Sequence, residues 1–202
     1  FIMNIAVIGT GYVGLVTGAC FSSVGNKVVC VDINKKKINL LKKHIIPIYE
    51  PGLNSIIKKS VNSGYLSFSN DMEVAINKSD IIFITVGTPM NEDGSCNLDY
   101  VSNASIDIGK YINDYKIIVT KSTIPSGTTF KVKNIINDEI KKRKKKINFD
   151  IANNPEFLKQ GKAVSDFNSP DRIIVGIEND NIKDFFSDLY SPFSFKNERM
   201  IY

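Results

Sequence analysis

Short apolar runs rich in β-branched residues alternate with longer amphipathic stretches along this chain. The runs have the length and composition of strands buried on both faces of a sheet, whereas the stretches carry apolar residues at helical spacing. Strands are predicted at Asn4–Ile8, Lys27–Asp32, Ile81–Val86, Lys116–Thr120, Asp150–Ala152 and Arg172–Ile177. Helices are predicted at Val13–Val24, Lys35–Lys43, Leu53–Asn62, Met72–Asn77, Leu98–Tyr111, Thr128–Lys144 and Ile182–Tyr190. This alternation predicts an α/β fold with a doubly wound, mainly parallel sheet and helices on both faces.

No internal repeat, low-complexity linker or change of composition divides the chain. The segment His44–Leu53 carries two prolines and is predicted to be a loop. Residues 1–2 precede Met3 and are interpreted as an artificial addition before the natural start. Ser191–Tyr202 has the pattern of a loop that enters another strand, so we expect residues 3–202 to be one domain of a longer protein.

Composition narrows the class of protein. Apolar residues make up 43% and charged residues 23% of the chain, as in an ordinary globular domain. No apolar run approaches the roughly 20 residues of a membrane helix, and we find no signal peptide, so we expect a cytoplasmic protein that does not bind membranes. The net charge of +5 comes largely from Lys141–Lys146, at the end of a predicted helix where basic residues favour the helix dipole. Without a nucleic-acid-binding motif beside it, this run predicts a solvated surface rather than a nucleic-acid site.

Cysteine and histidine are scarce. The three cysteines, Cys20, Cys30 and Cys96, are spaced for neither disulfides nor a zinc site, and we interpret them as structural or incidental. His44 is the only histidine, which argues against a histidine metal cluster and leaves no second candidate for a Ser-His-Asp triad. We therefore expect no metal site, and an acid or base other than imidazole.

A glycine-rich turn, Gly9–Gly14 (GTGYVG), follows the first predicted strand and opens the first predicted helix. Gly9 allows a tight turn, Gly11 allows close approach of a pyrophosphate, and Gly14 allows close helix packing. The free N–H groups at the helix start favour phosphate binding. Asp32 ends the second strand at the spacing where a carboxylate binds the ribose hydroxyls and repels a 2′-phosphate, which favours NAD over NADP.

This combination predicts a Rossmann-like NAD-binding fold, and two alternatives stay open. Lys35, Lys36 and Lys37 follow Asp32 closely and could hold a phosphate. The glycines could also serve packing alone.

Polar loops follow two further predicted strands. After the third strand, Thr88 is placed to hydrogen-bond a cofactor, although a plain strand-to-loop turn would look the same. After the fourth strand, Ser122 and Thr123 could face the nicotinamide or a reacting water. Thr128 is expected to cap the helix that follows.

A carboxylate follows the fifth predicted strand. Glu156 lies in Asn153–Leu158 (NNPEFL), beside a proline and apolar residues, a setting suited to general-base work. The alternative is a glutamate that satisfies N–H groups at a helix start, and residue types alone do not decide between them. Because the four segments follow four strands of one parallel sheet, they meet on the same edge. We therefore expect a dinucleotide-dependent enzyme domain.

The same segments resemble one family in order and spacing. GTGYVG, VDINKKKI, PIYEPGL, VGTP, KSTIPSGT and NNPEFLKQGKAVSDFNSPDRIIVG are similar to the UDP-glucose 6-dehydrogenase family, over nearly all of the chain from Met3. The last segment resembles UDP-glucose enzymes more than their GDP-mannose or UDP-N-acetylmannosamine relatives. The resemblance implies a two-step, NAD-dependent oxidation of UDP-glucose to UDP-glucuronate, through a cysteine-bound thiohemiacetal and thioester.

The resemblance also implies residue roles. Together with the turn, it gives as expected cofactor contacts Gly9, Gly11, Tyr12, Val13, Gly14, Asp32, Lys37, Thr88 and Thr123. Glu156 matches the residue associated with thioester hydrolysis and Thr123 the residue that helps to place its water, so these two are the expected catalytic residues. The expected UDP-sugar contacts are Glu156, Phe157, Leu158 and Lys159.

The chain departs from the family at two points. Gln160 stands where many relatives carry glutamate, which puts an ionic role there in doubt. The family's cysteine motif is absent from this sequence, together with its lysine and asparagine near the sugar. We therefore expect an N-terminal half that binds NAD without turnover, and that precedes a long helix and a UDP-binding domain in a homodimer or larger assembly.

Two rival hypotheses remain. The first is another Rossmann dehydrogenase of sugar nucleotides or hydroxyacids, against which the KSTIPSGT and NNPEFL segments argue. The second is a non-catalytic NAD-binding module.

Overall fold

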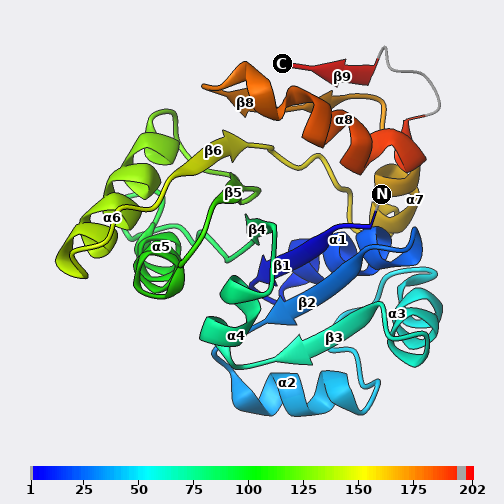
Figure 1. Cartoon of the computed structure of the whole chain (residues 1–202). Helices are drawn as coiled ribbons and strands as arrows, with labels where there is room; N and C mark the ends of the chain where they lie inside the picture. Colours follow the sequence, from blue (N-terminus) through cyan, green and yellow to red (C-terminus); the bar gives the residue numbers. More distant parts are fainter. Residues whose placement is uncertain (1, 195–198) are drawn as a thin grey trace.

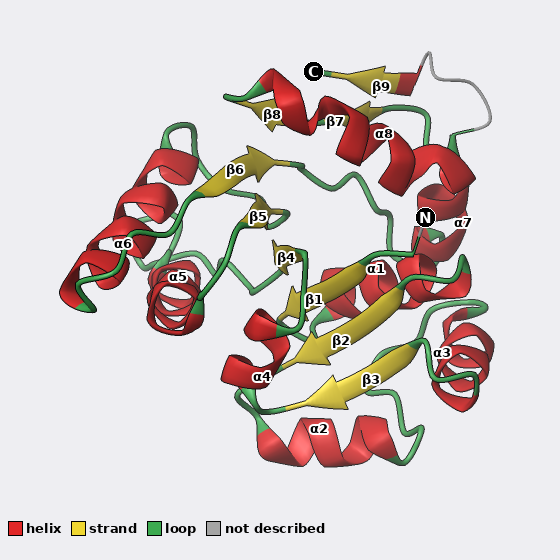
Figure 2. Ribbon diagram, viewed as in Figure 1, coloured by secondary structure: helices red, strands yellow, loops and turns green. Residues whose placement is uncertain are grey.

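The structure, a computed structural model, describes residues 2–194 and 199–202 and confirms an α/β fold around a seven-stranded sheet (Figure 1, Figure 2). The strands lie in the order β3-β2-β1-β4-β5-β6-β8. Their bounds are β1 Asn4–Ile8, β2 Lys27–Val31, β3 Leu66–Ser69, β4 Ile81–Ile84, β5 Lys116–Thr120, β6 Phe149–Asn153 and β8 Gly176–Ile177. Two short strands, β7 Ile173–Ile174 and β9 Met200–Ile201, form a separate parallel pair.

The winding of the sheet reverses at β1. The chain builds outward from β1 to β2 and β3, and then returns to the other side of β1 with β4, β5 and β6, all in parallel. β8 closes this side as an antiparallel strand. The carboxyl ends of β1 and β4 therefore meet at the reversal point, where open α/β sheets bind their ligands.

Helices cover both faces of the sheet (Figure 1). One face packs against α1 Tyr12–Ser23, α2 Lys35–Lys42, α3 Leu53–Asn62, α7 Ala163–Asn168 and α8 Lys183–Tyr190. The opposite face packs against α4 Met72–Asn77, α5 Asp99–Tyr111 and α6 Thr128–Lys142. Short 3-10 helices, η1 Asp180–Ile182 and η2 Ser191–Phe193, flank α8. Among residues 2–194 and 199–202, no helix is both long and apolar enough to cross a bilayer.

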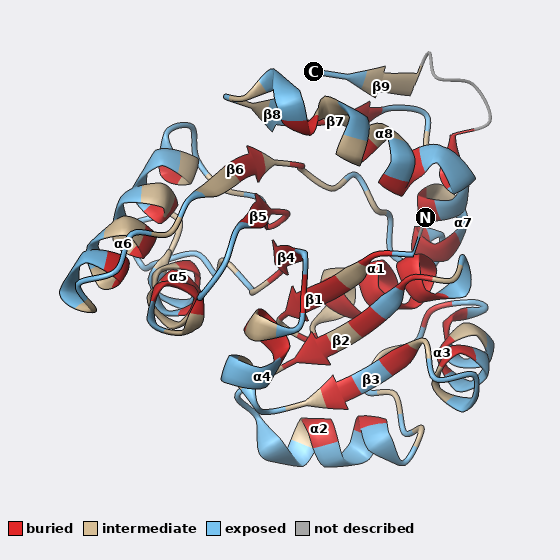
Figure 3. Cartoon of the chain, viewed as in Figure 1, coloured by how far each residue is buried: buried red, intermediate tan, exposed pale blue. Residues whose placement is uncertain are grey.

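The side chains of each central strand alternate between two cores. In β1, Ile5 and Val7 pack with the α1 face, and Ala6 and Ile8 pack with the α5 face. All four are at most 3% exposed, so the strand is buried on both sides (Figure 3). A strand in this position needs apolar residues at every position, which is why a continuous apolar run marks it in the sequence.

The predicted elements agree with the structure within a residue or two at their ends, with three differences. β3 was not predicted, because this edge strand is only four residues long and carries just two apolar side chains, Leu66 and Phe68. The predicted strand Arg172–Ile177 is divided between β7 and β8, which lie in different sheets. The short α7 was also not indicated. β9 confirms the strand expected near the chain's end, while residues 1 and 195–198 lie outside the described residues.

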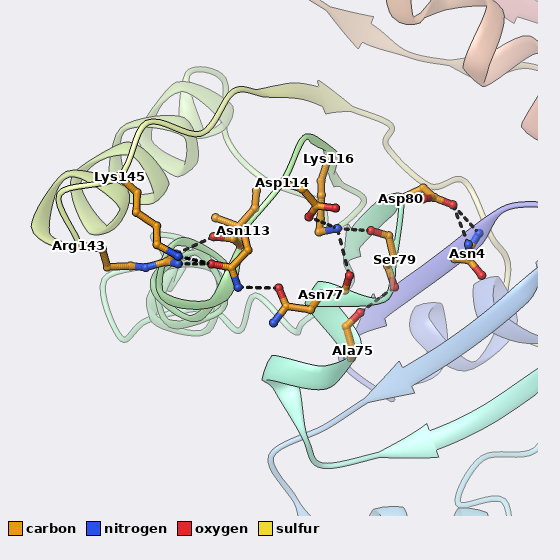
Figure 4. A network of polar contacts seen from close by, with 11 residues as sticks. Asn4, Ala75, Asn77, Ser79, Asp80, Asn113, Asp114, Lys116, Arg143 and Lys145 are labelled. Carbon is orange, nitrogen blue, oxygen red and sulfur yellow. Dashed lines mark hydrogen bonds and ion pairs between the residues drawn. The ribbon is translucent and has the colours of Figure 1, made fainter.

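Polar side chains at the amino ends of the strands form a network between neighbouring loops (Figure 4). Lys116 begins β5 with its side chain buried, and its Nζ donates to the carbonyl of Ser79 at 2.6 Å and pairs with Asp114 at 2.7 Å. Arg143 Nη1, just beyond α6, donates to two carbonyls at the end of α5 at 2.8 and 2.7 Å. Part of the basic run therefore caps a neighbouring helix, a more specific role than a solvated surface.

Candidate functional site

The glycine-rich turn joins β1 to α1 at the reversal point of the sheet. Gly9 has a φ of 102°, in the left-handed region that favours glycine, and its N–H donates to the last carbonyl of β2 at 2.8 Å. A Cβ atom on Gly14 would lie 1.9 Å from the carbonyl oxygen of Gly9, whereas one on Gly11 would meet nothing within 4 Å. Tyr12 and Val13 open α1 just beyond, both only partly buried. The turn is therefore closely packed at Gly14 and open at Gly11, as a pyrophosphate-binding turn requires.

Asp32 directly follows β2 beside this turn. Its Oδ2 accepts hydrogen bonds from the N–H (2.9 Å) and hydroxyl (2.6 Å) of Thr10, and its Oδ1 accepts the N–H of Asn34 at 3.0 Å. Lys37 Nζ lies 3.4 Å from Oδ2. Burial acts to raise the pKa of the Asp32 carboxyl, but the hydrogen bonds and the charge of Lys37 outweigh burial and lower the pKa. The carboxylate is therefore ionised, the state that binds ribose hydroxyls and repels a 2′-phosphate.

The loops after β4 and β5 meet at the same edge of the sheet. Thr88 Oγ1 donates to the carbonyl of Thr123 at 3.1 Å, so two of the predicted cofactor contacts are neighbours. The side chain of Ser122 instead turns inward, where its Oγ donates to a carbonyl of the β4 loop at 2.7 Å. Thr128 is the first residue of α6 and gives no side-chain cap; the cap residue is Gly127, with a φ of 81°. The predicted Thr128 cap is therefore wrong.

Residues 154–162, after β6, form neither helix nor strand. Glu156 lies in this segment, and its Oε2 accepts the N–H of Leu158 at 2.6 Å. α7 begins only at Ala163, so the alternative interpretation of Glu156 as a helix-start residue is wrong. The segment instead borders a cavity of about 530 Å³, which is lined by residues 154–159 and 169–173 with Lys121, Asp166, Phe167 and Tyr190.

The predicted sugar contacts differ in their exposure. Phe157 is 48% exposed, and the guanidinium of Arg172 lies 5.0 Å from the centre of its ring. Leu158 is half-buried against the core of the α1 face. Lys159 is exposed, and its N–H donates to Asp166 Oδ2 at 3.2 Å. All three side chains border the cavity together with Glu156.

Lys121 has no role predicted from sequence, yet it contributes a buried cation to the cavity wall. It is 4% exposed, its Nζ donates to Asn154 Oδ1 at 3.0 Å, and the Nζ lies 5.7 Å from the ring centre of Phe167. Asn154 Oδ1 also accepts the hydroxyl of Tyr190. Burial lowers the pKa of Lys121 to about 8, although the charge of Glu156 acts to raise it. A lysine directly after an apolar strand is the only sequence signal for this residue.

Glu50 is the second residue that sequence reasoning missed. It lies in the loop predicted at His44–Leu53, and its side chain is 5% exposed. Its carboxylate accepts the hydroxyl of Tyr12 and, at 2.8 Å, the N–H of Gly161. These contacts join a loop, the glycine-rich turn and the cavity segment, and no property of the loop's own residues indicates them.

Two of the three cysteines, Cys20 and Cys30, are fully buried. Burial raises the pKa of Cys20 and of Cys30 to about 12, so both thiols stay protonated near neutral pH. Cys96 lies in the loop between β4 and α5. Within the part of the chain that the structure describes, no group of three or more His, Cys, Asp or Glu side chains could hold a metal ion.

The fold and the polar loops at one sheet edge define a class of protein: a Rossmann-type, dinucleotide-binding oxidoreductase domain. A sequence model described as the UDP-glucose/GDP-mannose dehydrogenase family, NAD binding domain, matches residues 3–194. The chain therefore belongs to this family as its NAD-binding domain, which confirms the assignment made from the motifs. NAD is the cofactor of such a domain, and the open backbone at Gly11 and the ionised Asp32 both fit it.

Individual relatives agree with this assignment. The chain is 48% identical, over 94% of its length, to UDP-glucose 6-dehydrogenase TuaD of Bacillus subtilis, and covers 41% of that protein. It is 40% identical, over 98% of its length, to a UDP-glucose 6-dehydrogenase of Pseudomonas aeruginosa, of which it covers 44%. The structure of a UDP-glucose dehydrogenase from Pyrobaculum islandicum superimposes with a TM-score of 0.89 at 36% identity, over 96% of this chain and 45% of that one. The chain thus spans less than half the length of these relatives.

Proposed function

We propose that this chain is the NAD-binding part of an enzyme that oxidises UDP-glucose to UDP-glucuronate. The observation that carries the proposal is the grouping of four polar segments at the carboxyl edge of a Rossmann sheet, in a chain 48% identical to a UDP-glucose 6-dehydrogenase. One of these segments carries Glu156 and forms part of the wall of the cavity, and Lys121, which begins the loop after β5, borders the same cavity. Cofactor and sugar nucleotide would then approach each other across this edge.

NAD supplies a hydride acceptor when bound, and the chain's residues orient it. The turn of Gly9, Gly11 and Gly14, with Tyr12 and Val13 at the helix start, receives the pyrophosphate. Asp32, with Lys37 beside it, binds the ribose hydroxyls as a charged acceptor. Thr88 and Thr123 lie next to each other across two loops, where they position the nicotinamide end.

Glu156 and Thr123 both act on the water that releases the product. Glu156 stands on an irregular segment with one oxygen engaged by the N–H of Leu158, which holds the carboxylate in one orientation. It serves as the general base for the water that releases the product, and Thr123 helps to place that water. Phe157, Leu158 and Lys159 form the adjoining wall for the UDP-sugar.

The electron count of the reaction requires that the NADH formed first be replaced by a second NAD. Conversion of an alcohol to a carboxylate removes four electrons and NAD accepts two, so each sugar requires two NAD and one water. The covalent route also requires a thiolate, and Cys20 and Cys30 are buried with raised pKa values. We infer that the nucleophile belongs to a part of the enzyme outside this chain, and that the chain alone binds NAD without turnover.

An assay of NADH fluorescence tests the proposal. The 202-residue chain and the longer protein that contains it are each supplied with NAD and UDP-glucose, with GDP-mannose and UDP-N-acetylmannosamine as alternative substrates. The longer protein is expected to release two NADH per UDP-glucuronate, identified by mass spectrometry, and the chain none.

Two results would contradict the proposal. Oxidation of GDP-mannose in preference to UDP-glucose would move the enzyme to another branch of the family. Sustained turnover by the 202-residue chain, abolished by replacing one of its cysteines, would locate the nucleophile in this chain.

A further inference from the structure

Tyr12, which is partly buried, and Glu50, which is buried, form a pair across two segments that are far apart in the chain. Tyr12 is the first residue of α1 and belongs to the glycine-rich turn. Glu50 belongs to the loop between α2 and α3, where its side chain is buried while that of Tyr49 is 89% exposed. The hydroxyl of Tyr12 donates to Glu50 Oε2. A buried carboxylate needs such partners, because an uncompensated charge away from water is costly.

The pair holds a third segment, the one that continues from Glu156. The N–H of Gly161 donates to Glu50 Oε2 at 2.8 Å and lies 3.2 Å from the Tyr12 hydroxyl oxygen. The N–H of Val164 lies 3.4 Å from Glu50 Oε1. α7 starts here without a side-chain cap of its own, so Glu50 supplies from a distant loop the acceptor that its first turn lacks.

The direction of these hydrogen bonds is fixed. Burial raises the pKa of the Tyr12 hydroxyl to about 12, and the hydrogen bond with Glu50 adds to the rise. Burial acts to raise the pKa of Glu50, but the hydrogen bonds from Tyr12, Gly161 and Val164 outweigh it and lower the pKa. At neutral pH, Tyr12 therefore donates and Glu50 accepts.

We propose that Tyr12 and Glu50 are positioning residues that couple NAD on the glycine-rich turn to the order of residues 159–164, and so to the cavity segment. NAD restricts the backbone at the start of α1, which restricts the ring of Tyr12. Tyr12 and Glu50 then hold Gly161 more firmly. The link to UDP-sugar binding rests on the proposed function, whereas the coupling itself requires only NAD.

Hydrogen exchange of the 202-residue chain, with and without NAD, tests the coupling. In the wild type, saturating NAD is expected to slow amide exchange at Gly161 and Val164 by about fivefold or more. In Tyr12→Phe, which keeps the partly buried ring and loses the hydroxyl, this slowing is expected to disappear at equal NAD saturation. Tyr115→Phe is the matched control, because Tyr115 donates to the carboxylate of Asp150 at the opposite edge of the sheet; it should behave like the wild type.

Equal protection of residues 159–164 by NAD in the wild type and in Tyr12→Phe would overturn the proposal, as would no protection in the wild type. If Tyr12→Phe does not fold, Glu50→Gln takes its place, because its amide keeps an acceptor oxygen and loses the charge; it is expected to reduce the NAD-dependent protection, and unchanged protection would overturn the proposal. The experiment contains no sugar nucleotide, so a failure of UDP-glucose oxidation in the longer protein is a separate result.

Discussion

The two ends of β5 each carry a buried lysine, and their surroundings differ. Lys116, at the amino end, lies 2.7 Å from the carboxylate of Asp114 and donates to the carbonyl of Ser79 (Figure 4). Lys121, just past the carboxyl end, donates to the neutral amide of Asn154 beside the cavity. A carboxylate balances the first charge, whereas burial lowers the pKa of the second to about 8.

The tyrosine–carboxylate pairs differ in the same way. Tyr115 and Asp150 join the starts of two adjacent strands, β5 and β6. Tyr12 and Glu50 join the glycine-rich turn to a loop and, through Gly161, to a segment 111 residues further along the chain. At the amino edge, the polar groups bond to residues of adjacent strands and loops, and these bonds stabilise the fold. The carboxyl edge uses the same chemistry to hold distant segments around a cavity, as a binding site requires.

The largest effect is expected from Glu156→Gln in the longer protein. If Glu156 is the general base, loss of its charge should slow steady-state turnover about 10²- to 10⁴-fold, while a first burst of NADH and a covalent acyl-enzyme still form. Stopped-flow fluorescence and mass spectrometry of the quenched enzyme measure both. Glu178→Gln, which removes a surface partner of Lys133, is the control. An unchanged turnover in Glu156→Gln would contradict the general-base role, and would leave this carboxylate only its hydrogen bond with the N–H of Leu158.

Asp32→Ala should weaken NAD binding by the chain by about 1.5–3 kcal/mol, because it removes a charge-assisted contact to the ribose. Titration calorimetry with NAD and NADP measures this loss, with Asp80→Ala as control, since Asp80 bonds Asn4 at the amino edge. Equal affinity of the wild type for NAD and NADP would contradict the role given to Asp32.

Lys116→Met tests whether the amino edge serves stability. The change removes the donor to the buried residue Ser79, and an unpaired buried carbonyl costs about 1–3 kcal/mol of unfolding free energy. Urea unfolding measures the loss. Lys145→Met removes an exposed bond to Asn113, and should cost about 0.5 kcal/mol or less. Equal costs in the two variants would mean that burial at this edge adds nothing.

The sequence predicts what depends on neighbouring residues in the chain. Continuous apolar runs mark the strands buried on both faces, and the residues just after them fall on the carboxyl edge, so Asp32, Thr88 and Glu156 could be named in advance. β3 could not be predicted, because its four residues carry only two apolar side chains, too few for a clear pattern. The contacts of Glu50 and the Lys121–Asn154 hydrogen bond could not be predicted for another reason: each joins segments that meet only in the folded chain.

The sharpest test of the difference between the two lysines is the pH dependence of stability in Lys121→Met. The pKa of Lys121 falls from 10.5 to about 8 on folding, so between these values the unfolded chain binds more protons than the folded chain. The unfolding free energy of the wild type should therefore rise with pH across this window, by at most about 1.4 kcal/mol per pH unit from this group. Below this pH window, Lys121 is charged in both the folded and the unfolded chain, so the folded protein bears the full cost of burying the charge. Methionine removes the titration and keeps the volume, so the wild type should gain stability relative to Lys121→Met as the pH rises through the window. Urea unfolding at several pH values between about 7 and 10 measures the difference. Parallel curves would mean that folding does not change the titration of Lys121, and that the contrast between the two ends of β5 is one of position alone.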